Sequence, residues 1–167
     1  MSGRTSAALT LQRMFARTQK EPSEYFSCGL INENDIFHWR VAIIGPEGTL
    51  YRDGIFPAQI DFPDDFPQSP PKMRFLCPMW HPNISEDGTV CISILHQPGN
   101  DPWDNEKASE RWLPIHNIES IIVSVISLFT DPNPTSAFNV KANHDFLFDQ
   151  AEYKKKVRRC ARESINY

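Results

Sequence analysis

The sequence lacks the patterns that mark metal centres and redox sites. Its four cysteines are far apart, and none forms the C-x-x-C pair that is typical of zinc sites and redox couples. A chain of 167 residues is also long enough to fold without the disulfide bonds that small secreted domains need. We therefore expect no metal ion, and free thiols in a reducing compartment, namely the cytoplasm or the nucleus.

Long apolar segments are missing as well. No apolar run approaches the ~20 residues that span a bilayer, so the sequence predicts a soluble protein without a transmembrane segment. Residues 1–8 have neither the basic start nor the apolar run of a secretion signal. The formal net charge of −4 argues against nonspecific nucleic-acid binding, which requires clustered cations to neutralise phosphates. These absences favour a soluble intracellular protein.

The patterns that are present predict one α+β domain over residues 1–167. The length suits a single hydrophobic core. Turn signals separate the candidate strands by short intervals, which favours an antiparallel meander. Apolar periodicity predicts the following elements: a helix over residues 6–20, strands over 25–30, 37–44, 55–62 and 72–77, a buried helix over 118–129 and a closing helix from about 145.

One cysteine lies in a run with informative chemistry. Cys91 follows His81-Pro82-Asn83 by a short loop that contains Gly88. A free cysteine is most often a small buried hydrophobe, but a thiol after such a loop is placed where a substrate can reach it. No obvious catalytic histidine follows Cys91, and the Asn83 amide can donate to an oxyanion. This arrangement suits acyl transfer through a thioester better than hydrolysis, with Cys77 as the second candidate thiol.

The run from His81 to Leu95 resembles the active-site signature of ubiquitin-conjugating enzymes, in which His-Pro-Asn precedes the acceptor cysteine. Residues at about 97–110 form an insertion relative to the generic pattern, and this longer loop is similar to that of the G-type enzymes, with the R-type enzymes as the alternative. Further matches cover nearly the whole chain and include Phe37-His38-Trp39, Tyr51-Arg52-Asp53-Gly54, Phe62-Pro63-Asp64-Asp65-Phe66-Pro67, Pro70-Pro71-Lys72, Trp112-Leu113-Pro114 and Asp131-Pro132-Asn133-Pro134.

This resemblance implies both a fold and an activity. The implied fold is a four-stranded antiparallel meander sheet flanked by an N-terminal helix, a central buried helix and a C-terminal helix or helices. Cys91 would accept ubiquitin from an activating enzyme and pass it, with a RING-type ligase, to a lysine of a substrate or of ubiquitin. G-type relatives tend to build chains that direct proteins to the proteasome. The chain has no G-x-x-x-x-G-K-[ST] phosphate loop, so ATP would be used by the separate activating enzyme and no cofactor is implied here.

The resemblance also assigns roles to residues beside Cys91. It implies that Asn83 stabilises the oxyanion formed when a lysine attacks the thioester, although an asparagine in this place can equally cap its own turn. We interpret His81 as a structural residue of the loop, together with Pro82. Neither is expected to carry the chemistry itself.

A carboxylate that many relatives carry near the thiol is missing, because Ser136 stands at the corresponding position. A lysine is mostly charged at neutral pH, so its attack requires help from desolvation or from a positioned acid. We hypothesise that the insertion supplies such acids through Asp101 and Asp104. The alternative is an ordinary solvated acidic loop.

Two partner surfaces follow from the resemblance alone. The first helix and two proline-containing loops correspond to the region that docks RING-type ligases, and part of the first helix is also used by the activating enzyme. The alternative is that these residues only turn corners and fill the edge of the core. The candidate residues are Arg13, Arg17, Phe66, Pro67, Leu113, Pro114 and Ile115.

Two other functions remain open from the sequence. One is a noncatalytic ubiquitin-binding variant of the same fold, although such variants lose the thiol that Cys91 retains. The other is a cysteine hydrolase, which would need His96 or His116 held against Cys91 as a base. We expect a cytoplasmic location, with the nucleus and peripheral recruitment to the endoplasmic reticulum left open.

Overall fold

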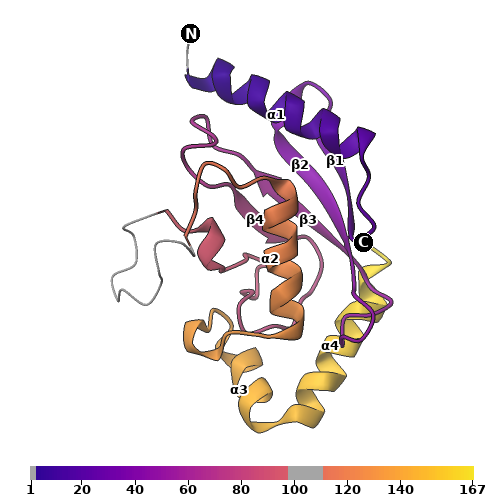
Figure 1. The fold of residues 1–167 in the computed structure, drawn as a ribbon. Coiled ribbons are helices and arrows are strands. Elements are labelled where there is room, and N and C mark those ends of the chain that lie inside the picture. The colour runs from indigo at the N-terminus through magenta and orange to yellow at the C-terminus, as the bar shows by residue number, and fades with distance from the viewer. Residues whose placement is uncertain (1–2, 98–110) are drawn as a thin grey trace.

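In the part of the chain that the structure describes, one α-helix precedes a block of four strands and three α-helices follow it (Figure 1). The computed structural model describes residues 3–97 and 111–167. Its elements are α1 (Gly3–Lys20), β1 (Phe26–Asn32), β2 (Asp35–Ile44), β3 (Ile55–Asp61), β4 (Lys72–Phe75), the 3-10 turn η1 (Ser93–Leu95), α2 (Ile118–Thr130), the 3-10 turn η3 (Pro134–Ser136), α3 (Val140–Phe148) and α4 (Gln150–Ser164).

The strands form the antiparallel meander that the turn signals predict. Their order is β1-β2-β3-β4, so each strand pairs with its neighbour in sequence. Alternate residues of a strand point to opposite faces of a sheet. On β2, Phe37, Trp39, Val41 and Ile43 are buried, whereas the residues between them are more exposed. One face of the sheet therefore belongs to the core and the other is more exposed to solvent.

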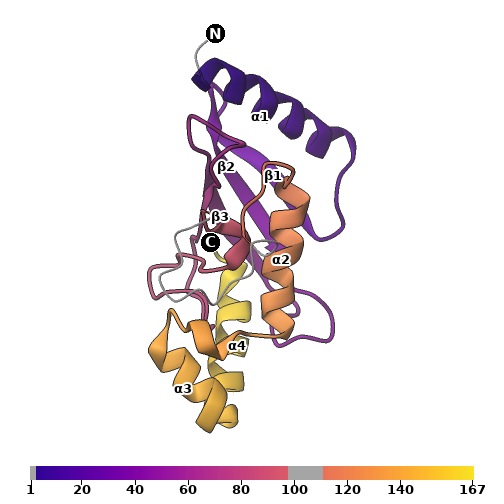
Figure 2. The same cartoon turned by 60° about the vertical axis from the view of Figure 1, so that its left-hand side comes forward.

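Helix α2 covers the apolar face of the sheet (Figure 2). Its start is fixed by Asn117, whose side chain accepts from the backbone N–H of Ser120, while the Ser120 hydroxyl accepts from the N–H of Asn117. At the other end, the ring of Phe129 stacks on Tyr51 with centroids 4.2 Å apart and meets Phe56 edge-on at 5.9 Å. The predicted central buried helix is thus confirmed, and it brings residues after 130 toward the loop that contains Asn83.

The end of the chain differs in one respect from the sequence prediction. Periodicity predicted a closing helix from about residue 145, and the family resemblance left one or more C-terminal helices open; two helices, α3 and α4, are present and meet at Asp149. The backbone N–H of Asp149 donates to the carbonyl of Asp145 at the end of α3. The side chain of Asp149 accepts from the N–H of Glu152 and caps the start of α4. Asp145 also accepts from Trp80 Nε1 at 3.1 Å and Lys156 Nζ at 3.0 Å, which joins both helices to the loop before His81.

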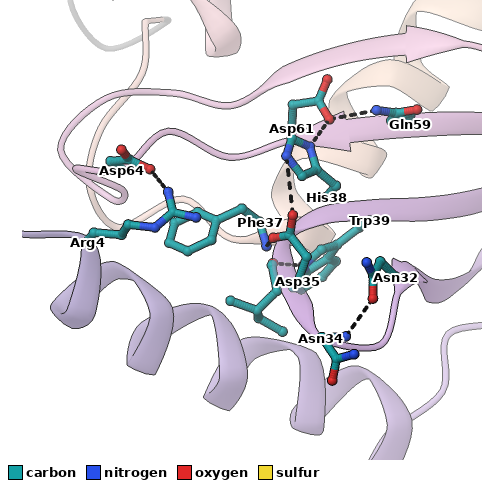
Figure 3. A network of polar contacts seen from close by, with 11 residues as sticks. Arg4, Asn32, Asn34, Asp35, Phe37, His38, Trp39, Gln59, Asp61 and Asp64 are labelled. Atoms are coloured by element: carbon teal, nitrogen blue, oxygen red, sulfur yellow. Dashed lines mark hydrogen bonds and ion pairs between the residues drawn. The ribbon is translucent and has the colours of Figure 1, made fainter.

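Helix α1 lies across the opposite end of the sheet from α3 and α4 in both views (Figures 1 and 2). Arg4 pairs with Asp64 and places its guanidinium carbon 4.1 Å from the ring centroid of Phe37 (Figure 3). In residues 3–97 and 111–167, no helix is long and apolar enough to cross a membrane. The same part of the chain contains no group of three or more His, Cys, Asp or Glu side chains that could hold a metal ion.

Candidate active site around Cys91

The loop from His81 to Cys91 folds back on itself. Gly88 has a positive φ of 94°, and a Cβ atom there would lie 2.2 Å from the carbonyl oxygen of Phe75, so only glycine fits this close approach. Ile84 bridges to Val90, and the backbone N–H of Cys91 donates to the carbonyl of Asn83 at 2.9 Å. This backbone hydrogen bond brings the thiol-bearing residue beside the predicted oxyanion donor.

The four cysteines lie in described parts of the chain and differ in their surroundings, with Cys28 and Cys91 partly exposed. Cys77 and Cys160 are buried in the core, where burial raises the pKa values of their thiols to about 12 and about 11. Burial also raises the pKa of Cys28 to about 12. These three thiols stay protonated and poorly nucleophilic at neutral pH. Cys91 is partly exposed at the end of the loop.

A histidine lies beside the thiol, which the sequence analysis did not expect of the transfer site. The turn η1 leads the chain back, so that Nε2 of His96 is 3.8 Å from Sγ of Cys91. This contact gives His96 no catalytic role by itself, so the absence of a catalytic histidine stays a prediction. His116, the other candidate base, packs against the ring of Trp112 with centroids 5.5 Å apart.

The side chain of Asn83 is buried, with 1% of its surface exposed, and its polar atoms are used. Nδ2 donates to the carbonyls of Asn133 at 2.8 Å and Ser136 at 3.0 Å, and Oδ1 accepts from the N–H of Asn133 at 2.8 Å. Asn83 thus holds the loop that contains η3 in place. Donation to an oxyanion requires one of these hydrogen bonds to open, so that role stays a prediction.

His81 is fully buried and has both ring nitrogens occupied. Nδ1 accepts from the N–H of Asn83 at 2.9 Å, so the proton sits on Nε2, which donates to the carbonyl of Leu128 at 2.6 Å. Burial lowers the pKa of His81 to about 4, and the ring is neutral near pH 7. The carbonyl of Pro82 accepts from Phe138 and Asn139. Both residues serve the geometry of the loop.

Three predictions concerned the carboxylate that would help the incoming lysine: its absence at Ser136 and its replacement by Asp101 and Asp104. Ser136 lies next to the site, because its carbonyl accepts from Asn83, and its exposed hydroxyl accepts from Asn133 Nδ2 at 3.4 Å. Asp101 and Asp104 lie outside the described residues. Their proposed action on the incoming lysine stays a prediction.

The residues predicted for the ligase surface divide into an exposed group on the loop after Trp112 and a buried residue beneath them, Phe66. Leu113 and Ile115 are 37% and 83% exposed, and Pro114 is exposed between them. Phe66 is only 2% exposed and packs on Trp112, so it supports this surface from below and is not part of it. Trp112 also donates through Nε1 to the carbonyl of Pro67 at 2.8 Å, which joins the two loops.

Arg13 and Arg17 lie on the exposed side of α1, as the prediction for the activating-enzyme surface requires. Both line a pocket of about 200 Å³ between α1 and the start of α2, together with Asn117, Ile118 and Glu119. Arg17 also pairs with Glu21 at 3.5 Å. A surface ion pair of this kind contributes little to stability and leaves the guanidinium available to a partner.

Comparison with known proteins shows the family of the chain. The family model described as ubiquitin-conjugating enzyme matches residues 10–161. The chain belongs to the ubiquitin-conjugating enzyme family. Its relatives include the probable ubiquitin-conjugating enzyme E2 7 of Caenorhabditis elegans, which is 51% identical over 95% of this chain and 96% of the relative. The human ubiquitin-conjugating enzyme E2 G2 is 43% identical over 95% of this chain and 98% of its own length.

A solved structure supports the same assignment. The structure of human ubiquitin-conjugating enzyme E2 G1 superimposes with a TM-score of 0.67 at 50% identity, covering 75% of this chain and 96% of that chain. The protein is therefore a G-type ubiquitin-conjugating enzyme, a transferase that acts through a cysteine, and its predicted α+β fold is confirmed.

Proposed function

We propose that this enzyme accepts ubiquitin as a thioester on Cys91 and transfers it to a lysine. The observation that carries the assignment is the contrast among the four thiols: burial raises the pKa values of Cys28, Cys77 and Cys160, whereas Cys91 is partly exposed beside Asn83. A thiol must be reachable and able to ionise to act as a nucleophile. Burial opposes the ionisation of Cys28, Cys77 and Cys160, and Cys91 is the partly exposed cysteine at the family's signature loop.

The chemistry runs in two balanced steps. The Cys91 thiolate attacks the carbonyl carbon of ubiquitin's C-terminus on the activating enzyme, the new C–S bond forms, and the activating enzyme's thiolate leaves. A neutral lysine amine then attacks the same carbon, the C–N bond forms, and Cys91 leaves as a thiolate while the amine loses a proton. Both thioesters are of similar energy, so ATP is required only for the earlier activation.

Two groups beside the thiol are proposed to assist the second step. His96, with Nε2 3.8 Å from the sulfur, is placed to accept a proton near the reacting atoms. Asn83 is proposed to release one of its amide hydrogens to the oxyanion, and loss of such a donor costs about 3 kcal/mol in other enzymes. Fixing the loop around Ser136 is the role of Asn83 before lysine arrives.

The partners are proposed from the family and the exposed surfaces. Leu113, Pro114 and Ile115 would contact a RING-type ligase, and Arg13 and Arg17 the activating enzyme. The products would be ubiquitin chains that direct substrates to the proteasome. We propose action in the cytoplasm and nucleus, with peripheral recruitment to the endoplasmic reticulum through a partner, and with no cofactor held by this chain.

A charging assay tests the assignment. The enzyme is incubated with activating enzyme, ubiquitin and Mg-ATP, and the products are compared on gels with and without reductant. We expect an adduct that reductant removes, that is absent in Cys91→Ala and that survives in Cys28→Ser and Cys160→Ser. An adduct that persists in Cys91→Ala would overturn the assignment to this thiol.

The contact between His96 and Cys91 favours one second candidate, a hydrolase. A hydrolase would cleave a ubiquitin ester in the absence of ATP and activating enzyme, because water would replace lysine as the nucleophile. The transfer function predicts no such cleavage above the rate of Cys91→Ala. A noncatalytic ubiquitin-binding variant would give neither an adduct nor cleavage.

A further inference from the structure

Strand β4 carries two cations that the activity described above does not use. Lys72 and Arg74 are both exposed, and they lie two residues apart on the more exposed face of the sheet. Within the described part of the chain, neither side chain makes a hydrogen bond or an ion pair. Residues 88–90 pair with the outer edge of β4, so a partner can approach these cations from the exposed face of the sheet.

Backbone pairing places these cations next to the catalytic loop. Arg74 bridges to Thr89 in antiparallel register, and the N–H of Val90 donates to the carbonyl of Met73 at 3.0 Å. Lys72 is two residues from Arg74 on the same face of β4, and Cys91 is two residues from Thr89 along the paired segment. Cβ atoms of directly opposed residues, here Arg74 and Thr89, are about 5 Å apart, so both cations lie close to the segment that leads to Cys91.

A pocket of about 220 Å³ opens beside Lys72 and Arg74. Thr89, Leu95 and His96 also line it, and the same His96 lies 3.8 Å from the Cys91 sulfur. The pocket is therefore continuous with the surroundings of the thiol. A side chain that fills this pocket would therefore come from the molecule that reacts at Cys91.

One acid, Asp61, lines the pocket as well. Its Oδ1 accepts from Nδ1 of His38 at 2.5 Å and from Nε2 of Gln59 at 2.8 Å, as Figure 3 shows. These contacts hold the carboxylate toward its neighbours on β2 and β3. The described lining thus holds two cations, Lys72 and Arg74, and one carboxylate, that of Asp61, which is opposite Lys72 in the sheet register. Arg74 also lies near enough to Asp87 to contribute to the lowered pKa of that carboxyl.

We propose that this pocket binds an anionic side chain of the acceptor protein, close in sequence to the lysine that receives ubiquitin. The proposal rests on the transfer function and names the class of acceptor. An extended chain advances about 3.3 Å per residue, so an acid two to four residues from the lysine reaches the pocket while the lysine lies at Cys91. An aspartate or glutamate and a phosphorylated residue share the required charge.

Matched acceptor peptides test the proposal. The enzyme is charged on Cys91, activation is quenched, and discharge is followed in single turnover at increasing concentrations of peptide. The peptides contain one lysine with glutamate, glutamine, serine or phosphoserine three residues away. At low ionic strength, contact with one or two exposed cations predicts a preference of roughly fivefold for the glutamate over the glutamine peptide, which decreases as salt screens the charges.

The phosphoserine arm distinguishes the two sources of the anion. If the ratio of discharge rates for phosphoserine over serine exceeds the ratio for glutamate over glutamine, the pocket prefers phosphorylated acceptors. If the phosphoserine/serine ratio is equal to or below the glutamate/glutamine ratio, the pocket prefers acidic sequences. Equal rates for all four peptides with the unmodified enzyme would overturn the proposal.

Substitutions on the sheet supply the matched comparison. The double variant Lys72→Gln/Arg74→Gln is expected to discriminate less than twofold between glutamate and glutamine. Arg40→Gln removes one exposed cation from β2 on the same face, two strands from Arg74 in the register through Gln59, and is expected to keep the full preference. A preference that survives in the double variant, or that is lost equally in Arg40→Gln, would contradict the proposal.

Charging and discharge to free lysine are measured for every variant and used to normalise the peptide rates. Failure of the unmodified enzyme to charge, or to discharge to free lysine, would refute the transfer function itself. Normal charging and free-lysine discharge without any peptide preference would refute the pocket alone.

Discussion

The carboxamide of Asn83 holds the backbone of Asn133 from both sides, accepting from its N–H and donating to its carbonyl, each at 2.8 Å. A third hydrogen bond reaches the carbonyl of Ser136. The same side chain thus holds the loop from Asn133 to Ser136 in place and is the predicted oxyanion donor. These two roles can be separated by experiment.

Replacing Asn83 with alanine should therefore reduce both stability and lysine discharge. Three buried hydrogen bonds at about 1 kcal/mol each predict a loss of about 3 kcal/mol in the free energy of unfolding, measured by urea denaturation. Well below the unfolding midpoint, charging should persist while discharge to lysine falls about a hundredfold. Unchanged stability would contradict the role of Asn83 in holding this loop in place. Normal discharge by the folded variant would contradict its role as oxyanion donor.

The buried, neutral His81 predicts a pH dependence of stability. Its pKa of about 4 in the folded state lies below the unfolded value of 6.5, so as the pH falls from 6.5 to 4 only the unfolded state takes up the proton. Stability is unaffected by this group above pH 6.5 and is lost below it, by about 3 kcal/mol at pH 4. Denaturation series at several pH values should show this loss. His81→Gln should remove it, while exposed His144→Gln should not.

The contact between His96 and Cys91 predicts the reactivity of the thiol. A protonated imidazole stabilises a neighbouring thiolate, so His96→Gln should lower the rate of alkylation of Cys91 by iodoacetamide near neutral pH. His116→Gln is the control, because its ring packs on Trp112. Rates at position 91 can be followed by mass spectrometry of the intact protein. Superimposable pH–rate profiles for the enzyme and His96→Gln would contradict a functional contact.

Two residues of the predicted ligase surface should behave in opposite ways. Phe66 is buried between Phe62 and Trp112, so Phe66→Ala should destabilise the fold by about 3 to 5 kcal/mol. Ile115 is exposed, and Ile115→Ala should change stability by less than about 0.5 kcal/mol while reducing discharge stimulated by a RING-type ligase. Stimulation that is unaffected in Ile115→Ala would remove this residue from the docking surface.

The local patterns of the sequence predicted most of the fold. Alternation placed β2 within two residues of its observed start, and the helical spacing of Ile118, Ile121, Ile122, Val125 and Phe129 outweighed their strand propensity. The break between α3 and α4 was missed because it depends on the capping role of Asp149 inside a continuous polar run. The Asn139 cap, which accepts from the N–H of Ala142, was a readable signal for the start of α3.

The site was less predictable than the fold, because its contacts join distant residues. Nothing near Asn83 in the sequence indicates that its partners lie fifty residues later at Asn133. His96 is only five residues from Cys91, but its approach depends on the turn η1, which the sequence analysis did not predict. The motif identified the thiol, and only the three-dimensional structure shows what surrounds it.

The most direct test of the central claim is to locate the bond between ubiquitin and this chain. The Cys91→Ser variant, charged with activating enzyme, ubiquitin and Mg-ATP, should form an adduct that resists reductant, since an oxygen ester replaces the thioester. Proteolysis and mass spectrometry should then find the remnant of ubiquitin's C-terminus at position 91. A remnant at any other residue, or no adduct in this variant while Cys77→Ser charges normally, would contradict Cys91 as the acceptor.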